Sequence, residues 1–189
     1  KSISPGSNDM VVFAYYGHGF RFKNETGPFP QLGLFSNEGL TQEIIRENTI
    51  NLEEIFNLLR AKGARLNIVL GDCCNNELSM QRFEVTELDL QSWPTKWNRE
   101  NCARLIEKEK GSYLAAAASK GQLAACNKRE GGYFTFSFFQ FLETAFESGN
   151  VDWGGIINKA GEFASFKSER AICGDKPCMQ DAISRVVVA

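Results

Sequence analysis

Two reactive side chains follow the two most apolar stretches of the chain. VVFAYYGHG at 11–19 contains His18, and RLNIVLGDCC at 65–74 ends in Cys74. Both stretches are β-rich, and ligands of open α/β sheets bind at the carboxyl ends of the strands. A thiolate attacks a carbonyl carbon while an imidazole moves the protons of thiol and leaving amine. If the two strands are neighbours, the sequence predicts a Cys-His site, with Gly19 and Cys74 N–H groups facing a developing oxyanion.

His18 is the only histidine in 189 residues. A zinc site with two or more histidines is therefore excluded, and any histidine-assisted catalysis must use this residue. Two plainer interpretations stay open: a lone histidine after a strand is often structural, and cysteines at a strand end are often small buried hydrophobes. We adopt the second for Cys73, because strand alternation turns it to the face opposite Cys74.

Composition narrows the class of protein. The chain carries 21 Lys+Arg against 23 Asp+Glu, a net charge of -2, and 43% hydrophobic residues. One domain is the default at this length. A nucleic-acid or membrane-surface role needs a basic excess, and no apolar run approaches the roughly 18 residues of a membrane span. The first residues as given do not form a signal peptide, and the compartment stays open.

The elements that must position these residues alternate between strands and helices. Asn51 is expected to begin a helix, with Glu54 at the capping-box distance and Gly63 as its end. Both strands before the reactive residues are apolar at successive positions, which predicts strands covered on both faces. The other expected elements are a loop at 20–49, a polar connection at 75–100, helices at 100–110, 134–146 and 152–163, and strands at 112–119 and 184–189.

This order predicts an α/β fold, a three-layer αβα sandwich with a mostly parallel central sheet. Phe134, Phe138, Phe141 and Ala145 form one helical stripe, which we interpret as core. Only three or four strands are visible, so the first strands are expected on a segment preceding Lys1.

Several motifs together resemble the caspase-like cysteine peptidases, in particular metacaspases and bacterial metacaspase-like proteins (orthocaspases). They are VVFAYYGHG, NIVLGDCCNN, SYLAAAASKGQLA, GGYFTFSFFQFL and INLEEIFNLL. Their order and spacing are more specific than any one of them. The resemblance implies a caspase-haemoglobinase-like fold, with the family's initial strand-helix-strand-helix segment missing before Lys1. It divides the chain into a large-subunit-like part at 1–76, an intersubunit-like connection at 77–110 and a small-subunit-like part at 111–189.

By position, the resemblance makes His18 the dyad histidine and Cys74 the nucleophile. It places Asp72 and Tyr16 in the S1 pocket and so implies a basic P1 residue. The implied function is an endopeptidase cleaving protein or peptide substrates after Arg or Lys. A buried carboxylate needs a cationic partner, which a substrate Arg or Lys provides. The alternative for Asp72 is that it caps the turn that follows it.

The resemblance also implies possible self-processing in the connection between the two parts. Basic residues available for such a cut are Arg82, Lys96, Arg99, Lys108 and Lys110, and nothing in the sequence selects one of them. A preceding N-terminal fragment of the same protein is a possible partner.

Three departures from the family pattern bear on function. Tyr16 stands where the family often has serine, which would reshape the S1 wall. Asn75-Asn76 follows the cysteine in place of the usual residues, and this is the support for an alternative, a catalytically inactive interaction or scaffold module. Calcium-dependent members use an acidic cluster, and only Glu53 and Glu54 could occupy part of it. Calcium is thus a possible cofactor, and none is required by the sequence.

Two weaker motifs complete the analysis. Cys173 and Cys178 could form a disulfide or half a metal site with Cys102 and Cys126, but the spacing is not that of a zinc ribbon, and we expect two or more free thiols. Asn24-Glu25-Thr26 matches a glycosylation sequon, a signal that means little without secretion.

Overall fold

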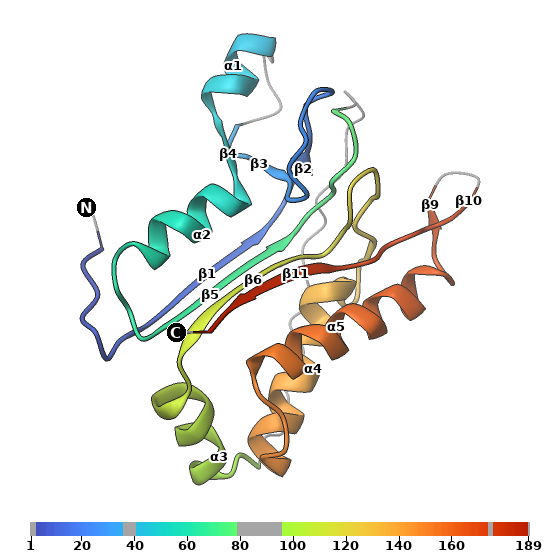
Figure 1. Ribbon diagram of the computed structural model, residues 1–189. Helices are drawn as coiled ribbons and strands as arrows, with labels where there is room; N and C mark the ends of the chain where they lie inside the picture. Colours follow the sequence, from blue (N-terminus) through green and yellow to red (C-terminus); the bar gives the residue numbers. More distant parts are fainter. Residues whose placement is uncertain (1–2, 36–40, 79–95, 174–175, 189) are drawn as a thin grey trace.

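A computed structural model describes residues 3–35, 41–78, 96–173 and 176–188 of the chain. Its main sheet has the strand order β1-β5-β6-β11 (Figure 1). The strands are β1 (Met10–Tyr16), β5 (Leu66–Asp72), β6 (Gly111–Ala116) and β11 (Ile183–Val187). β1, β5 and β6 are parallel and β11 is antiparallel to β6. The predicted mostly parallel central sheet is confirmed.

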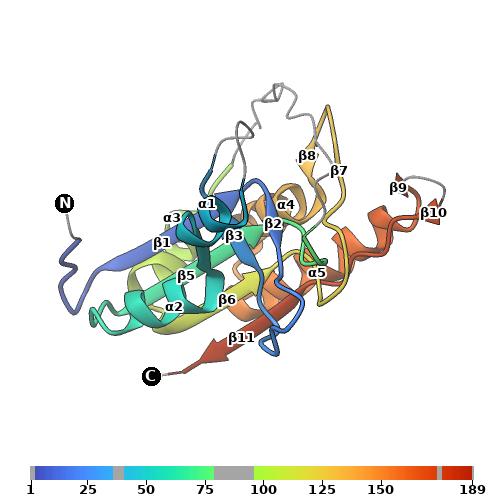
Figure 2. The same cartoon turned by 90° about the horizontal axis from the view of Figure 1, so that it is seen from above.

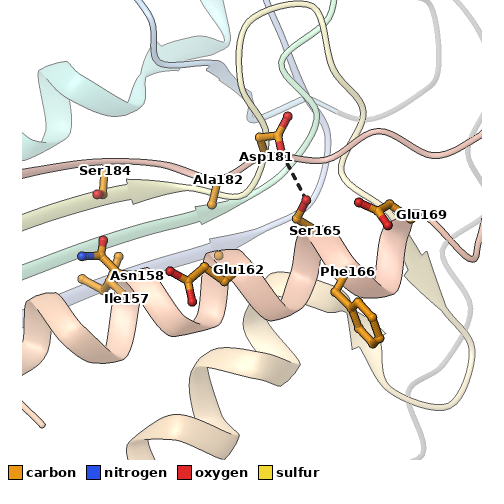
Figure 3. Close-up of a pocket in the computed structure, with 10 residues that line it drawn as sticks. Ile157, Asn158, Glu162, Ser165, Phe166, Glu169, Asp181, Ala182 and Ser184 are labelled. Carbon is orange, nitrogen blue, oxygen red and sulfur yellow. Dashed lines mark hydrogen bonds between the residues drawn. The ribbon is translucent and has the colours of Figure 1, made fainter.

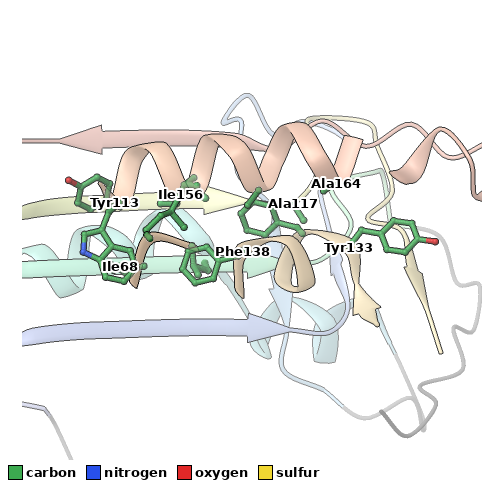
Figure 4. Close-up of a cluster of buried hydrophobic side chains, with 14 of the residues drawn as sticks. Ile68, Tyr113, Ala117, Tyr133, Phe138, Ile156 and Ala164 are labelled. Carbon is green, nitrogen blue, oxygen red and sulfur yellow. The ribbon is translucent and has the colours of Figure 1, made fainter. Parts of the chain in front are cut away.

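Helices cover both faces of this sheet, as Figures 1 and 2 show. Helix α2 (Leu52–Arg60) lies on one face, and helices α4 (Tyr133–Ser148) and α5 (Trp153–Ser168) lie on the other. The side chains between α4, α5 and the sheet form the larger hydrophobic core (Figure 4). In this core, the ring of Phe138 stacks on that of Trp153. The phenylalanine stripe is therefore core: Phe134 and Phe138 are buried and Phe141 packs against the same cluster.

The helix termini differ in how they are capped. Asn51 caps α2 by accepting the Glu53 N–H at 2.9 Å, and Asp152 caps α5 by accepting the Gly155 N–H at 2.7 Å. The first confirms the predicted helix start. The N-cap of helix α4 is Gly132, which has no side chain, so an acceptor for the first N–H groups of the helix must come from elsewhere in the chain.

Burial separates the two strands that carry the reactive residues. Every residue of β5 is buried, as predicted. The same prediction is wrong for β1, which is an edge strand whose alternate residues Val12 and Tyr16 are 55% and 45% exposed. The apolar composition of β1 reflects burial of one face: Val11, Phe13 and Tyr15 pack against the hydrophobic cluster on the α2 side. On the other side, Met10 packs against the larger core.

The segment expected to be a loop at 20–49 contains regular structure. Short strands β2 (Gly19–Phe20), β3 (Gln31–Gly33) and β4 (Thr49–Asn51) form a three-stranded sheet, and helix α1 (Gln42–Glu47) lies between the last two. Two further pairs are β7 (Cys126–Asn127) with β8 (Gly131–Gly132), and β9 (Ile172–Cys173) with β10 (Lys176–Pro177). Strands this short leave no periodic pattern.

The remaining elements follow the prediction with shifted ends. The helix expected at 100–110 is helix α3 (Arg99–Ala103) followed by a π-helical turn, Arg104–Lys108. Helix α5 continues to Ser168, beyond the expected end at 163. Cys178 is disulfide-bonded, whereas Cys73, Cys74, Cys102 and Cys126 are free, which confirms the expected free thiols. In the described ranges, no helix is long and apolar enough to cross a bilayer.

Candidate active site

His18 and Cys74 leave the sheet side by side. Strands β1 and β5 are parallel neighbours, and their last paired residues are Tyr16 and Asp72. The Gly17 N–H continues this pairing with a hydrogen bond to the Asp72 carbonyl at 3.4 Å. His18 and Cys74 each lie two residues beyond this last pair, His18 after β1 and Cys74 after β5. The condition on which the sequence prediction rested, that the two strands are neighbours, is met.

The glycines on either side of His18 are required by close packing. A Cβ on Gly17 would lie 2.7 Å from Tyr15 Oη, and one on Gly19 would overlap the Cys73 sulfur and the Cys74 carbonyl oxygen. The turn after β1 therefore packs directly on the turn after β5, backbone against backbone. Glycine on both sides of His18 leaves the space that this close approach of the two turns requires.

The Tyr15 hydroxyl contacts the backbone of the turn that carries His18. Its Oη lies 3.0 Å from the His18 carbonyl oxygen and 2.9 Å from the Gly33 carbonyl oxygen. Burial, with Cys73 nearby, raises the pKa of Tyr15 to about 12, so the phenol stays protonated as a donor. The Gly33 N–H donates to His18 O at 2.9 Å, which makes Gly19 and Leu32 a non-hydrogen-bonded pair. The Gly19 N–H is consequently directed away from β3.

The Cys74 thiol lies against the backbone of Ala124. Its Sγ accepts the Ala124 N–H at 3.4 Å and faces the Ala124 carbonyl oxygen at 4.0 Å. Burial raises the pKa of Cys74 above its ordinary value, and the nearby Asp72 and Cys126 raise it further, against the opposing effect of the Ala124 N–H. The resting group at neutral pH is therefore the thiol, and a nucleophilic role requires a base to take its proton.

Asp72 caps helix α4 from the end of β5. The carboxylate is 4% exposed, and its Oδ2 accepts the Thr135 N–H at 2.8 Å. It packs so tightly on Gly132 that any Cβ there would overlap it. Burial raises the pKa of Asp72, while the Thr135 hydrogen bonds act to lower it. Capping is thus observed, but of a helix some 60 residues along the chain rather than of the following turn.

The side chains of Tyr16 and Cys126 lie close together and near Asp72. Burial, together with the nearby Cys126, raises the pKa of Tyr16 to about 12. Asp72 and Cys74 contribute to that shift through their charge and so lie near the phenol. Four side chains from three segments therefore gather at this edge of the sheet. The sequence offered Cys126 only as part of a possible metal site, and no pattern predicted its place beside Tyr16, because β7 is only two residues long.

Asn75 is a buried junction of three loops. Its Oδ1 accepts from the Arg21 guanidinium at 3.0 Å, and its Nδ2 donates to Pro28 O at 2.7 Å and Ala118 O at 3.0 Å. The backbone adds a hydrogen bond from Asn75 N to Gln122 O at 2.9 Å. The departure from the family pattern after the cysteine is therefore a structural one. The Asn75 hydrogen bonds fix the turn that carries Cys74.

The acidic residues considered for calcium do not fit such a site. Glu53 forms an ion pair with Arg185, and Glu54 is exposed one residue further along α2. Among the described residues, no three acidic, histidine or cysteine side chains gather as metal ligands would. Calcium ligation needs six to eight oxygens, so we assign no step to this ion.

The cavity drawn in Figure 3 lies away from these residues. It has a volume of about 540 Å³ and is bounded by α5 and the segment 181–184, including Glu162, Ser165 and Asp181. His18, Cys74 and Asp72 do not line it. Of the basic residues considered for self-processing, four are described and exposed, namely Lys96, Arg99, Lys108 and Lys110, whereas Arg82 lies outside the described residues.

Comparison with known families gives one finding. The family model described as the caspase domain matches residues 1–173. No curated protein matches the chain.

Proposed function

The chain belongs to the caspase-domain family, a family of cysteine peptidases, and we propose on this basis that it is an endopeptidase cleaving after Arg or Lys through Cys74 and His18. We further propose that it is of the metacaspase type. The observation that carries the proposal is the register of β1 against β5, which brings these two residues to the same edge of the sheet.

In the proposed reaction, His18 takes the proton of the Cys74 thiol. The thiolate attacks the scissile carbonyl carbon, and the N–H groups of Gly19 and Cys74 stabilise the resulting oxyanion. His18 then protonates the leaving amine, and a water molecule hydrolyses the acyl-enzyme with His18 again as base. The raised pKa of Cys74 supports the need for this base, because the unassisted thiol stays protonated at neutral pH.

A backbone edge beside Cys74 supports a peptide as the substrate. The N–H of Ala125 donates to Gln180 Oε1, and its carbonyl accepts the Tyr133 N–H. Both groups therefore point away from the Cys74 sulfur. Successive peptide groups of an extended chain alternate in direction, so the polar groups of Ala124 and Cys126 face the Cys74 side. Ala124 N–H bonded to the sulfur follows this pattern. An extended substrate can add to such an edge as a strand.

The proposed basic P1 preference depends on Asp72, with Tyr16 as the pocket wall. A cationic P1 side chain would supply the opposite charge that this buried carboxylate lacks among its described contacts with Thr135. Self-processing is proposed for the connection at 77–110, without a preferred site. The substrates that follow from this are proteins or peptides with accessible Arg or Lys.

The test uses tetrapeptide amide reporters with Arg, Lys or Asp at P1, on the wild type and on Cys74→Ala and Cys73→Ala. We expect cleavage after Arg and Lys, lost in Cys74→Ala and largely retained in Cys73→Ala, whose thiol is buried on the other face of β5. Cleavage only after Asp, or equal loss in both variants, contradicts the proposal. Intact mass after incubation with and without calcium reports self-cleavage and its site.

One observation favours the second candidate function, an inactive scaffold. Asp72 is already engaged by the Thr135 N–H, so its charge has a structural use that needs no substrate. A peptide electrophile with Arg at P1 separates the two functions. Covalent labelling of Cys74 indicates a peptidase, and no labelling indicates a scaffold.

A further inference from the structure

The segment Gly121–Asn127 is held from behind by the C-terminal part of the chain. Gln180 Oε1 accepts the Ala125 N–H at 2.8 Å, on the side of the segment opposite the Cys74 sulfur. The Ala124 N–H, one residue earlier, meets that sulfur at 3.4 Å. The two N–H groups belong to consecutive peptide groups and point to opposite sides of the segment, as they do in an extended chain.

Gln180 is an unusual residue for its position. It is 1% exposed and ranks among the largest fully buried side chains. Within the described part of the chain, its Nε2 has no hydrogen-bond partner. A buried amide with an unmet donor is unfavourable, whereas an apolar side chain of similar size would fill the space without this cost. What an apolar residue could not do is accept the Ala125 N–H.

We call the Gln180 hydrogen bond to Ala125 N–H the brace. The neighbouring Asp181 is itself fixed by hydrogen bonds to Gln122 and to Ser165. Its N–H donates to Gln122 Oε1 at 2.8 Å, and its Oδ2 accepts from Gln122 Nε2 at 2.7 Å. Its Oδ1 accepts from the Ser165 hydroxyl of α5 at 3.1 Å (Figure 3). The Gln122 carbonyl in turn accepts the Asn75 N–H next to the nucleophile. Gln180 thus acts from a segment fixed both to α5 and to the turn after Cys74.

We infer that Gln180 is a positioning residue: by accepting the Ala125 N–H from behind, it holds the Ala124 and Cys126 edge in the register at which a peptide substrate pairs beside Cys74. This inference rests on the proposed function, because it concerns how the proposed substrate is held. It assigns no contact between Gln180 and substrate. Its effect should grow with the length of substrate backbone that pairs with the edge.

The test compares Gln180→Met, which keeps the volume and loses the acceptor, with Gln180→Glu, which keeps an acceptor oxygen. Each is assayed on a tetrapeptide Arg reporter and on a single-residue Arg amide that has no P2–P4 backbone. We expect Gln180→Met to raise KM for the tetrapeptide about tenfold with little change in kcat, and to leave the single-residue amide almost unchanged. Gln180→Glu should recover part of the loss. Ser168→Ala, another fully buried polar side chain bonded within α5, serves as the control with neither effect.

Equal losses on both reporters would mean a general structural role and overturn the inference. Hydrogen exchange across 122–126 gives a readout that does not need turnover: faster exchange in Gln180→Met supports the brace, and unchanged exchange overturns it. A wild type that cleaves neither reporter contradicts the proposed function, and the brace is then decided by exchange alone.

Discussion

The Asp72 carboxylate at the end of β5 accepts the Thr135 N–H of helix α4 at 2.8 Å. The residue two positions before Cys74 is thereby fixed to the first turn of a helix from the other half of the chain. Helix N-termini favour negative charge, so this contact is favourable in itself. Any role of Asp72 in binding a cationic substrate comes in addition to this capping role. Substitutions of Asp72 can separate the two roles.

Replacing Asp72 by Asn should separate charge from capping. Asn keeps an oxygen for the Thr135 N–H and removes the charge, so the free energy of unfolding should change little while the preference for Arg over neutral P1 residues falls about 100-fold. Asp72→Ala should also lose about 1 kcal/mol of stability with the cap. Kinetics on paired reporters and urea titration measure both. An undiminished Arg preference in Asp72→Asn would remove this residue from the S1 pocket.

The raised pKa of Cys74 predicts the pH dependence of its alkylation. The folded protein holds this proton more tightly than a free thiol, whose pKa is about 8.5, so the thiolate fraction keeps rising at pH values where a free thiol has reached its limit. Iodoacetamide labelling of Cys74, followed by peptide mapping, should therefore still increase above about pH 9.5, where the labelling of free cysteine levels off. Free cysteine measured in parallel is the reference. A plateau at or below pH 8 would show that the thiolate is stabilised at rest.

Gly19→Ala should damage the site through packing alone. The new Cβ overlaps the Cys73 sulfur and the Cys74 carbonyl, so the two turns must separate, at a cost of roughly 1–3 kcal/mol. Activity should fall far more than stability, since the turns carry His18 and Cys74. Gly27→Ala, where a Cβ meets nothing within 4 Å, is the matched control and should behave as wild type. Equal activity and equal stability of the two variants would contradict the proposed clash at Gly19.

Asn75→Ala should destabilise the whole domain. The change leaves the buried Arg21 guanidinium and the Ala118 carbonyl each without one partner, which costs roughly 2–3 kcal/mol. Asn76→Ala is the control, because Asn76 accepts the Arg21 N–H through its backbone carbonyl, which alanine retains. Thermal unfolding compares the pair. If Asn76→Ala is the more destabilised variant, the junction has been assigned to the wrong residue.

The sequence was sufficient for the elements whose pattern extends over a full strand or helix. The apolar residues of the stretch 65–74 predicted the buried β5, and Asn51 marked the start of α2. The same reasoning misjudged β1, because composition does not tell which strand lies at the edge of a sheet. The short strands β2, β3 and β4 were missed because two or three residues carry no period.

For the candidate site, the sequence indicated which residues could react but not what surrounds them. His18 and Cys74 were placed at one sheet edge from their positions after strands. Asp72 with Thr135, Cys126 with Tyr16, and Gln180 with Ala125 are contacts between distant segments, and no local pattern encodes them. Asn75 was noticed only as a departure, and its meaning as a junction required the positions of Arg21, Pro28 and Ala118.

The hydrogen bonds of Asn75 have a consequence for how the protein comes apart. They tie the turn carrying Cys74 to the loop after β2 and to the segment after β6, so opening this turn alone would break buried hydrogen bonds on both sides. Sites that open locally exchange and inactivate well below the melting temperature of their domain. Here Cys74 should keep its surroundings until the sheet itself is lost, so that heat inactivation and global unfolding form one cooperative event.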